Sequence, residues 1–271
     1  MAREITHPAQ GAANNTVLEL MSTFDPGELV ARGMVQGHSS FRKFGFNPLV
    51  GTTESIIATT TGVVLPWTPL VAQEVEVVSD DARDGVGGDG ALTVTVQGLD
   101  ANWNEQEVTV TLNGQTPVAT TGLTWIRIHC AFVASTGTYR GSNLGVITVI
   151  ETESPAETIR TLPIGHGQCG NSHYSVAAGK AVLVKNYNIQ IGTGKTATVH
   201  LRFAANGNDV TAPYSGGQRV LLELEGVLTG QSGNFGTPFF IPPYSDIWAT
   251  GEVTAQTGHI FFDYSGTLIT L

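Results

Sequence analysis

The stretch ALTVTVQGLDANWNEQEVTVTLNG, residues 91–114, shows the pattern that decides the fold. Apolar side chains alternate with threonines at residues 91–96, and the same two-residue period returns at residues 108–112. Successive side chains of a β-strand point to opposite faces of a sheet, so the alternation predicts two strands with one apolar face each. Asn113-Gly114 follows at once and suits a tight type I′ turn. We therefore expect a hairpin that returns through residues 115–119.

Similar strand patterns recur along the chain from about residue 70. The further segments with this character are 71–78, 124–132, 145–151, 181–191, 195–203, 220–227, 239–241, 246–250 and 258–268. No convincing amphipathic helix separates them and no repeat of fixed period is visible, which together indicate an all-β protein with a β-sandwich, of which a jelly roll is the common large form. In residues 124–132 we expect Ile126 and Ile128 on the buried face and Arg127 and His129 on the polar face.

The composition excludes several classes of protein. The 271 residues include 33 Gly and 12 Pro, with 41% hydrophobic and only 13% charged residues, which suits many short strands joined by tight turns. A formal net charge of -10 repels polyphosphate and anionic lipid, so nucleic-acid binding and membrane binding are both disfavoured. No apolar run approaches the roughly 20 residues that span a bilayer, and the N-terminus lacks the features of a signal peptide. We expect a soluble protein that is made in the cytoplasm.

The pattern along the chain predicts three regions. Residues 1–45 are polar and irregular and are predicted to form an N-terminal arm, residues 46–152 a small β domain, and residues 153–271 a jelly-roll-like β-sandwich. The arm holds an apolar island too small for its own core, so it should contact the body or a neighbouring subunit, and its removal should leave a folded body; a disordered terminus is the alternative. The predicted assembly residues are this island and two tryptophans, namely Val17, Leu18, Leu20, Met21, Trp67 and Trp103.

Three clusters could carry chemistry, but each favours a structural interpretation. Gly192–Thr196 matches the end of a phosphate-binding loop, yet the opening glycine is missing and a strand pattern follows it, which predicts a hairpin turn. Four aspartates within residues 80–89 fit no EF-hand spacing and predict a solvated loop. His166, Cys169 and His173 could bind zinc, but a fourth ligand is not evident.

The remaining polar residues give little support to an enzyme. Cys130 and Cys169 are too few for a disulfide framework and are expected to be buried free thiols. No nucleophile elbow and no HExxH motif occurs. Carboxylates such as Asp246, Glu252 and Asp263 keep a glycan-cleaving enzyme open as a rival, since β-sandwiches of that kind have weak signatures. We predict no catalytic residues, no cofactor and no bound metal.

Several short motifs carry a resemblance to a known family. They are FGFNP at 44–48, ESI at 54–56, PW at 66–67, VEVVS at 75–79, GLDANWNEQ at 98–106 and TLNG at 111–114. Together they resemble a family of tailed-bacteriophage virion structural proteins over roughly residues 44–150, and the 98–106 motif is the most specific. AAGK at 177–180 and IPPYSDI at 241–247 are similar to C-terminal β domains of other phage surface proteins, where the first alanine of AAGK is typically proline.

The resemblance implies a non-enzymatic virion protein. It suggests a homo-oligomer, for which we predict a trimer, that decorates or cements the capsid exterior or the neck, or forms a fibre there. Its partners would be the major capsid protein or the neck and tail proteins of the same particle, without nucleic acid or membrane. The alternative is a tail or receptor-binding protein whose C-terminal domain binds a host surface glycan.

Overall fold

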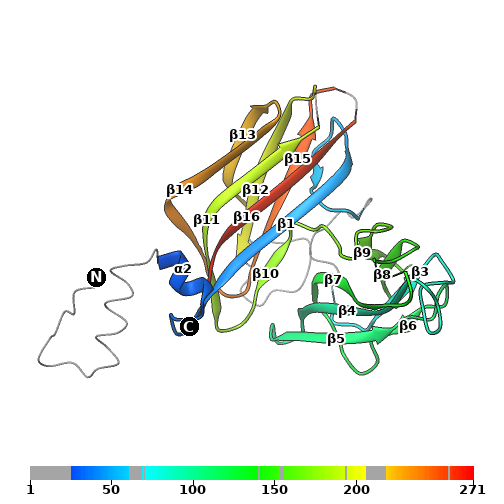
Figure 1. Ribbon diagram of the computed structural model, residues 1–271. Coiled ribbons are helices and arrows are strands. Elements are labelled where there is room, and N and C mark those ends of the chain that lie inside the picture. Colours follow the sequence, from blue (N-terminus) through cyan, green and yellow to red (C-terminus); the bar gives the residue numbers. More distant parts are fainter. Residues whose placement is uncertain are drawn as a thin grey trace, which may run out of the picture.

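The computed structural model describes residues 26–60, 69, 71–139, 141–152, 156–192, 194–205, 218–255 and 257–271. These residues form two β bodies that lie side by side (Figure 1), with one short helix, α2 (Pro26–Ala31), before the first strand. The all-β prediction is confirmed. In the described part of the chain, no helix has the length and apolar character needed to cross a membrane.

The larger body is a sandwich of two antiparallel sheets. One sheet has the order β1-β16-β11-β14, and the other has the order β10-β15-β12-β13 with a short β2 paired to β15. The bounds are β1 (His38–Val50), β2 (Ser55–Ile56), β10 (Tyr174–Val176), β11 (Lys180–Ile191), β12 (Ala197–Ala205), β13 (Arg219–Val227), β14 (Gly230–Ile241), β15 (Ser245–Val253) and β16 (Gly258–Thr270). Apart from β2, the first strand pairs with the last, the second with the seventh, the third with the sixth and the fourth with the fifth. This nested pairing is a jelly roll, as the sequence predicted.

The smaller body is inserted between β2 and β10 of the jelly roll. It consists of a four-stranded sheet with the order β6-β3-β8-β9 and a three-stranded sheet with the order β5-β4-β7. The bounds are β3 (Val75–Ser79), β4 (Ala91–Leu99), β5 (Glu105–Thr111), β6 (Val118–Ala119), β7 (Arg127–Thr136), β8 (Ile147–Glu151) and β9 (Thr158–Leu162). Because it is an insertion, the small domain is joined to the jelly roll by two chain connections.

The predicted domain boundary at residue 46 differs from the structure. Residues 38–50 form the edge strand β1, which pairs along β16 of the jelly roll, and β2 also joins the jelly roll. The alternation of β1 is interrupted at Gly45, where an added Cβ would lie 2.1 Å from the Ile57 carbonyl oxygen. Position 45 therefore holds a glycine, because two segments approach closely there, and an apolar side chain that would have continued the strand pattern is missing. Residues 1–25 of the predicted arm lie outside the described residues.

Each domain has its own apolar core. Leu201, Ile247 and Phe262 are among the residues buried between the jelly-roll sheets, and Ile128 and Val149 are among those buried in the small domain. The inward orientation predicted for Ile128 is therefore confirmed. Since the two clusters are separate, the contact between the domains has to be made by other residues.

Two predicted hairpins are wrong in their pairing. The chain turns at Asn113-Gly114, but β6 then pairs with β3 in the other sheet, while β5 pairs with β4. The turn around Gly194 likewise joins β11 to β12, which lie in different sheets of the jelly roll. Alternation identifies a strand and its apolar face, but it carries no information about which neighbour the strand pairs with.

Candidate functional site

The two domains meet at a buried junction that three of the sequence motifs build together. The turn within residues 98–106 packs against residues 177–180 and 241–247 of the jelly roll. Its apolar cluster consists of Leu99, Trp103, Ile126 and Ala177, with Ala178 and Tyr244 at its margin. The Ala178 amide also donates a hydrogen bond of 2.9 Å to the Trp103 carbonyl oxygen. Motifs from distant parts of the chain thus share one structural role.

Local hydrogen bonds set the shape of the 98–106 turn. The Asp100 carboxylate accepts bonds from the amides of Asn102 and Asn104 at 2.8 and 2.9 Å, and Trp103 between them has φ of 63°. At Gly98 an added Cβ would lie 2.0 Å from the Arg127 carbonyl oxygen, so only glycine lets β7 approach β4 here. The turn therefore aims the Trp103 ring out of the small domain and toward the jelly roll.

Trp103 is a contact within the chain, and this corrects its predicted assembly role. Its side chain is 2% exposed and its ring packs edge-on against Tyr244 at a centroid distance of 5.7 Å. Tyr244 has φ of 58°, and these two are the only non-glycine residues with positive φ in the described part of the chain. Such backbone conformations cost about 1–3 kcal/mol each. The contacts of the junction therefore offset backbone strain in both domains, at Trp103 and at Tyr244. The other predicted assembly residues, Val17, Leu18, Leu20, Met21 and Trp67, lie outside the described residues.

A buried ion pair crosses the junction next to Trp103. The Arg127 guanidinium, at the start of β7, binds the Asp246 carboxylate of β15 through Nε–Oδ1 and Nη2–Oδ2 contacts of 3.1 and 3.2 Å. The two side chains are 1% and 0% exposed. The Arg127 guanidinium also lies over the Trp103 ring, 5.1 Å from its centroid. Arg127 is therefore held by a charge and by an aromatic face at once.

Further polar groups complete the surroundings of Asp246. His173 Nε2 donates to Asp246 Oδ1 at 2.9 Å, and the Ser175 hydroxyl donates to the same oxygen. Burial alone would raise the pKa of Asp246, but the Arg127 charge and the hydrogen bonds from His173 and Arg127 hold it well below its usual range. Burial lowers the pKa of His173 to about 4. At neutral pH the network therefore contains a carboxylate, a guanidinium and a neutral imidazole.

The network does not have the geometry of a catalytic triad. In a triad, the serine and the carboxylate bind opposite nitrogens of the imidazole ring. Here Ser175 Oγ and Asp246 Oδ1 both lie near His173 Nε2, at 3.0 and 2.9 Å, while Nδ1 faces Arg160 at 3.4 Å. All three members are fully buried, so no substrate reaches the serine.

The carboxylates named for the rival function, a glycan-cleaving enzyme, do not lie close together in the structure. Asp246 and Glu252 are six residues apart on β15, a separation of about 20 Å along an extended strand, whereas paired catalytic carboxyl groups lie about 5–10 Å apart. Asp263 lies on β16 in the other sheet and binds Arg42. Asp246 and Glu252 therefore cannot form a catalytic pair, and the Asp263 carboxylate is engaged by Arg42.

The polar face predicted for residues 124–132 is buried against the jelly roll. The His129 ring packs on Tyr174 at a centroid distance of 4.5 Å, and its Nε2 accepts a bond of 3.2 Å from the Ser175 amide. Lys43 of β1 donates to the His129 carbonyl oxygen at 2.6 Å. Burial lowers the pKa values of both Lys43 and His129. The polar face of this strand is buried because a second domain covers it, which the alternation in the sequence does not indicate.

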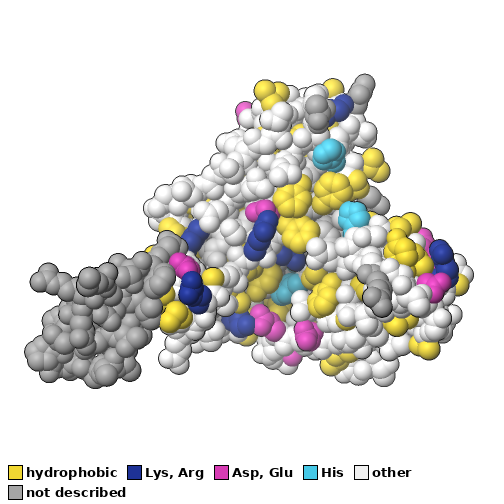
Figure 2. Space-filling model, in the orientation of Figure 1, with side chains coloured by type: hydrophobic (Ala, Val, Ile, Leu, Met, Phe, Trp, Pro, Cys, Tyr) yellow, Lys and Arg dark blue, Asp and Glu magenta, His cyan; other side chains and the backbone are white. Residues whose placement is uncertain are grey.

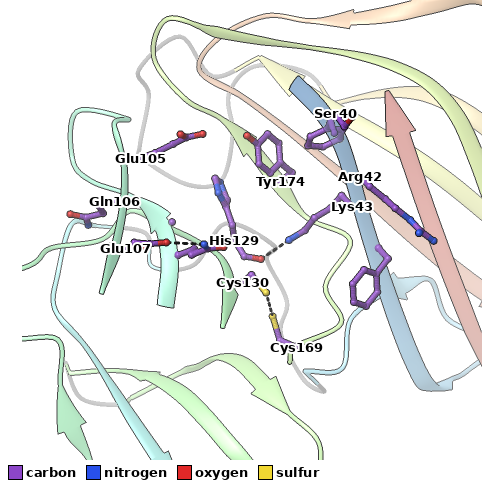
Figure 3. A pocket seen from close by; sticks show the side chains of 14 residues that line it. Ser40, Arg42, Lys43, Glu105, Gln106, Glu107, His129, Cys130, Cys169 and Tyr174 are labelled. Atoms are coloured by element: carbon purple, nitrogen blue, oxygen red, sulfur yellow. Dashed lines mark hydrogen bonds between the residues drawn. The ribbon is translucent and has the colours of Figure 1, made fainter. Parts of the chain in front are cut away.

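A cavity of about 560 Å³ opens beside this junction. Its walls come from β1, β4, β5, β7, β10 and the segment before β10. Figure 3 shows Glu105, Gln106 and Glu107 on one side and Lys43 of β1 on the other. Charged, histidine and hydrophobic side chains gather on this face of the molecule where the two domains meet (Figure 2). The cavity thus combines aromatic, apolar and hydrogen-bonding walls.

The structure also separates the three residues that were considered as zinc ligands. The Cys169 thiol faces Cys130, His173 binds Asp246, and His166 is exposed and stacks on Phe46, so the three candidate zinc ligands do not converge. No group of three potential metal ligands occurs among the described residues.

The acidic loop at residues 80–89 was predicted to be solvated, but its Asp84 side chain is not. It is fully buried and accepts bonds from the amides of Ala91, Leu144 and Gly145, which order the loop.

Comparisons with known proteins give little further information. No known protein family and no curated protein matches the chain. The solved structures with some similarity include particles derived from infectious bursal virus, with 13% identity, a TM-score of 0.24 and coverage of 86% of this chain and 69% of that chain. They also include the VP2 subviral particle of infectious bursal disease virus, with 11% identity, a TM-score of 0.23 and coverage of 90% and 77%. TM-scores this low carry no argument about shared fold or function.

Proposed function

We propose that this chain is a non-enzymatic structural protein of a virus particle. The observation that carries the proposal is the jelly roll with a second β domain locked onto it by the buried pair Arg127–Asp246. Jelly rolls occur in viral capsid proteins, but also in lectins and other folds, so the fold alone does not decide the function. The junction supports a structural role, because its polar groups are buried and bonded to each other instead of being presented to a substrate.

Rigid domain orientation suits a protein that has to hold a fixed position in an assembly. Two chain connections, an apolar cluster and a desolvated ion network all oppose rotation of the small domain. Breaking a buried ion pair costs about 3–5 kcal/mol, so a loosened arrangement is sparsely populated. The motif resemblance to tailed-phage virion proteins supports the same interpretation, since its 98–106 motif is the segment that builds the junction.

The finer proposal is a homo-oligomer, for which we favour a trimer, on the capsid exterior or the neck. It would act as a decoration, cement or fibre protein that is made in the host cytoplasm and then resides in the virion. The jelly-roll edge strands β13 and β14 support self-association, because Val220 is 45% and Phe240 54% exposed on them. Exposed apolar edge strands are an aggregation hazard that burial in a symmetric oligomer removes.

Light scattering coupled to size exclusion tests the self-association. We expect a single species at a multiple of 28.6 kDa that withstands EDTA. A monomer at micromolar concentration would contradict the oligomer. The particle role is tested by adding purified protein to particles that lack it and locating it by cryo-electron microscopy. Failure to bind any site on head, neck or tail would contradict the virion role.

A tail or receptor-binding protein is the second candidate, and the cavity beside the junction favours it. The Tyr174 and Phe44 rings together with Gln97 and Glu107 give the aromatic and hydrogen-bonding lining that sugar sites use. Incubation with host surface polysaccharide distinguishes the possibilities. Retention of the polysaccharide without new reducing ends would support a binding protein, release of reducing ends would indicate an enzyme, and no retention would leave the decoration role.

A further inference from the structure

The cavity beside the junction ends at two thiols that the sequence places far apart. Cys130 lies in β7, and Cys169 lies in the segment between β9 and β10. Their sulfur atoms are 3.6 Å apart although 39 positions separate them in the chain, and both are free thiols that line the cavity. Figure 3 shows the two side chains directed toward each other.

Backbone contacts hold the two segments together independently of the thiols. The Cys169 amide donates to the Ala131 carbonyl oxygen at 3.0 Å, and the Val133 amide donates to the Gly167 carbonyl oxygen at 2.7 Å. The segment that returns the chain to the jelly roll is therefore fixed along β7. The sulfur atoms approach each other in the folded chain without any rearrangement of domains.

The surroundings favour Cys169 as the reactive member of the pair. The Ala131 amide donates to Cys169 Sγ at 3.3 Å, and the contact with Cys130 together with the Lys43 and Arg160 charges lowers the pKa of Cys169. The same contact and burial raise the pKa of Cys130. A thiolate beside a neutral thiol is the arrangement in which one sulfur reacts with an oxidant and the other resolves the product.

We propose that Cys130 and Cys169 form an oxidation site in which hydrogen peroxide that enters the cavity converts the two thiols into an intrachain disulfide. This inference does not depend on the proposed function. It names a covalent modification that ties β7 of the small domain to the segment leading into the jelly roll.

The reaction has two balanced steps. In the first, the Cys169 thiolate attacks one peroxide oxygen, the O–O bond breaks, and the other oxygen leaves as hydroxide and takes up a proton to form water. Cys169 is then a sulfenic acid, oxidised by two electrons. In the second, the Cys130 sulfur attacks the Cys169 sulfur, an S–S bond replaces the S–O bond, and the departing hydroxide takes the Cys130 proton as a second water.

The disulfide closes a covalent loop across the small domain and should stabilise it. Cross-linking constrains the unfolded chain, so a rise in Tm of about 5 °C or more is expected on oxidation. A thiol reductant should return the Tm to its original value. Because the bond is intrachain, the oligomer mass should be the same in both redox states.

Hydrogen peroxide and the purified full-length protein test the inference. We expect the free thiols to fall from two to none, with peptide mapping showing one Cys130–Cys169 disulfide within a chain. In Cys130→Ser, dimedone should trap a sulfenic acid at Cys169, and in Cys169→Ser the remaining Cys130 should react roughly tenfold or more slowly.

Three outcomes would overturn the inference. They are thiols that stay reduced under conditions that oxidise the unfolded chain, disulfides that form between chains, and faster oxidation of Cys130 than of Cys169. Timed alkylation of the wild-type protein, followed by mapping of the first labelled cysteine, gives the same comparison without any substitution. The result therefore does not depend on whether the serine variants fold.

Discussion

Arg127 and Asp246 are 119 positions apart in the chain, yet their side chains form a two-point ion pair that is almost completely removed from solvent. One belongs to the inserted domain and the other to the jelly roll. The pair therefore links the stability of each domain to its position on the other. The following predictions test this link and the fold around it.

Replacing Arg127 with methionine should destabilise the protein by about 3–5 kcal/mol, because the Asp246 charge would remain buried without its cation. Thermal unfolding measures the effect as a lower Tm. Arg83→Met is the matched control, since Arg83 pairs with Asp81 at an exposed site, and no measurable change is expected there. Equal effects of the two substitutions would show that the buried pair contributes no more than a surface pair.

Stability should fall as the pH is lowered from about 6.5 to 4. The pKa of His173 is about 4 in the folded protein and near 6.5 when unfolded, so the unfolded state binds the proton first in this range. The free energy of unfolding then decreases by about 1.4 kcal/mol for each pH unit from this group. Below pH 4 the low pKa of Asp246 adds a second loss of stability as its unfolded form takes up protons. Chemical denaturation at several pH values should give a shallower slope for His173→Gln than for the unsubstituted protein.

Ile128→Asp should destabilise the small domain by several kcal/mol, because Ile128 is 0% exposed in its core and the new carboxylate would have no partner. Thr111→Asp on exposed β5 is the control and should change the Tm little. An unchanged Tm for Ile128→Asp would contradict the inward orientation of β7.

Trp103→Ala should cost about 3–5 kcal/mol, since it removes a buried ring that contacts both Arg127 and Tyr244. The oligomer mass should be unaffected, because Trp103 lies inside its own chain. Loss of assembly with an unchanged Tm would restore the assembly role that the sequence predicted for this residue.

Removing residues 1–45 should prevent folding, in contrast to the expectation from sequence that this segment is a separable arm. The deletion takes away most of β1, which pairs with β16 and buries Phe41 in the jelly-roll core. Removing residues 1–25 leaves every described strand in place and should preserve the Tm. Circular dichroism and solubility of the two truncated proteins provide the comparison, and a folded 46–271 chain would contradict the role of β1.

The sequence by itself determined the β class, the position of most strands and the inward orientation of residues such as Ile128. It could do so because the two-residue period of apolar side chains is a local property that burial of one sheet face imposes. It also located the 98–106 motif, but the reason for that motif was not visible in the local pattern.

Only the tertiary structure decided which strands pair and which segments meet. The strand at residues 38–50 was missed because Gly45 accommodates a backbone contact instead of filling the core. His129 and Arg127 were expected on the polar face of their strand. The local pattern did not show that a second domain buries this face, because the residues that cover it are more than 40 positions away. The Cys130–Cys169 contact could not be predicted from the sequence either. The two sulfur atoms are 39 positions apart and are brought together by backbone hydrogen bonds, which do not depend on a side-chain pattern.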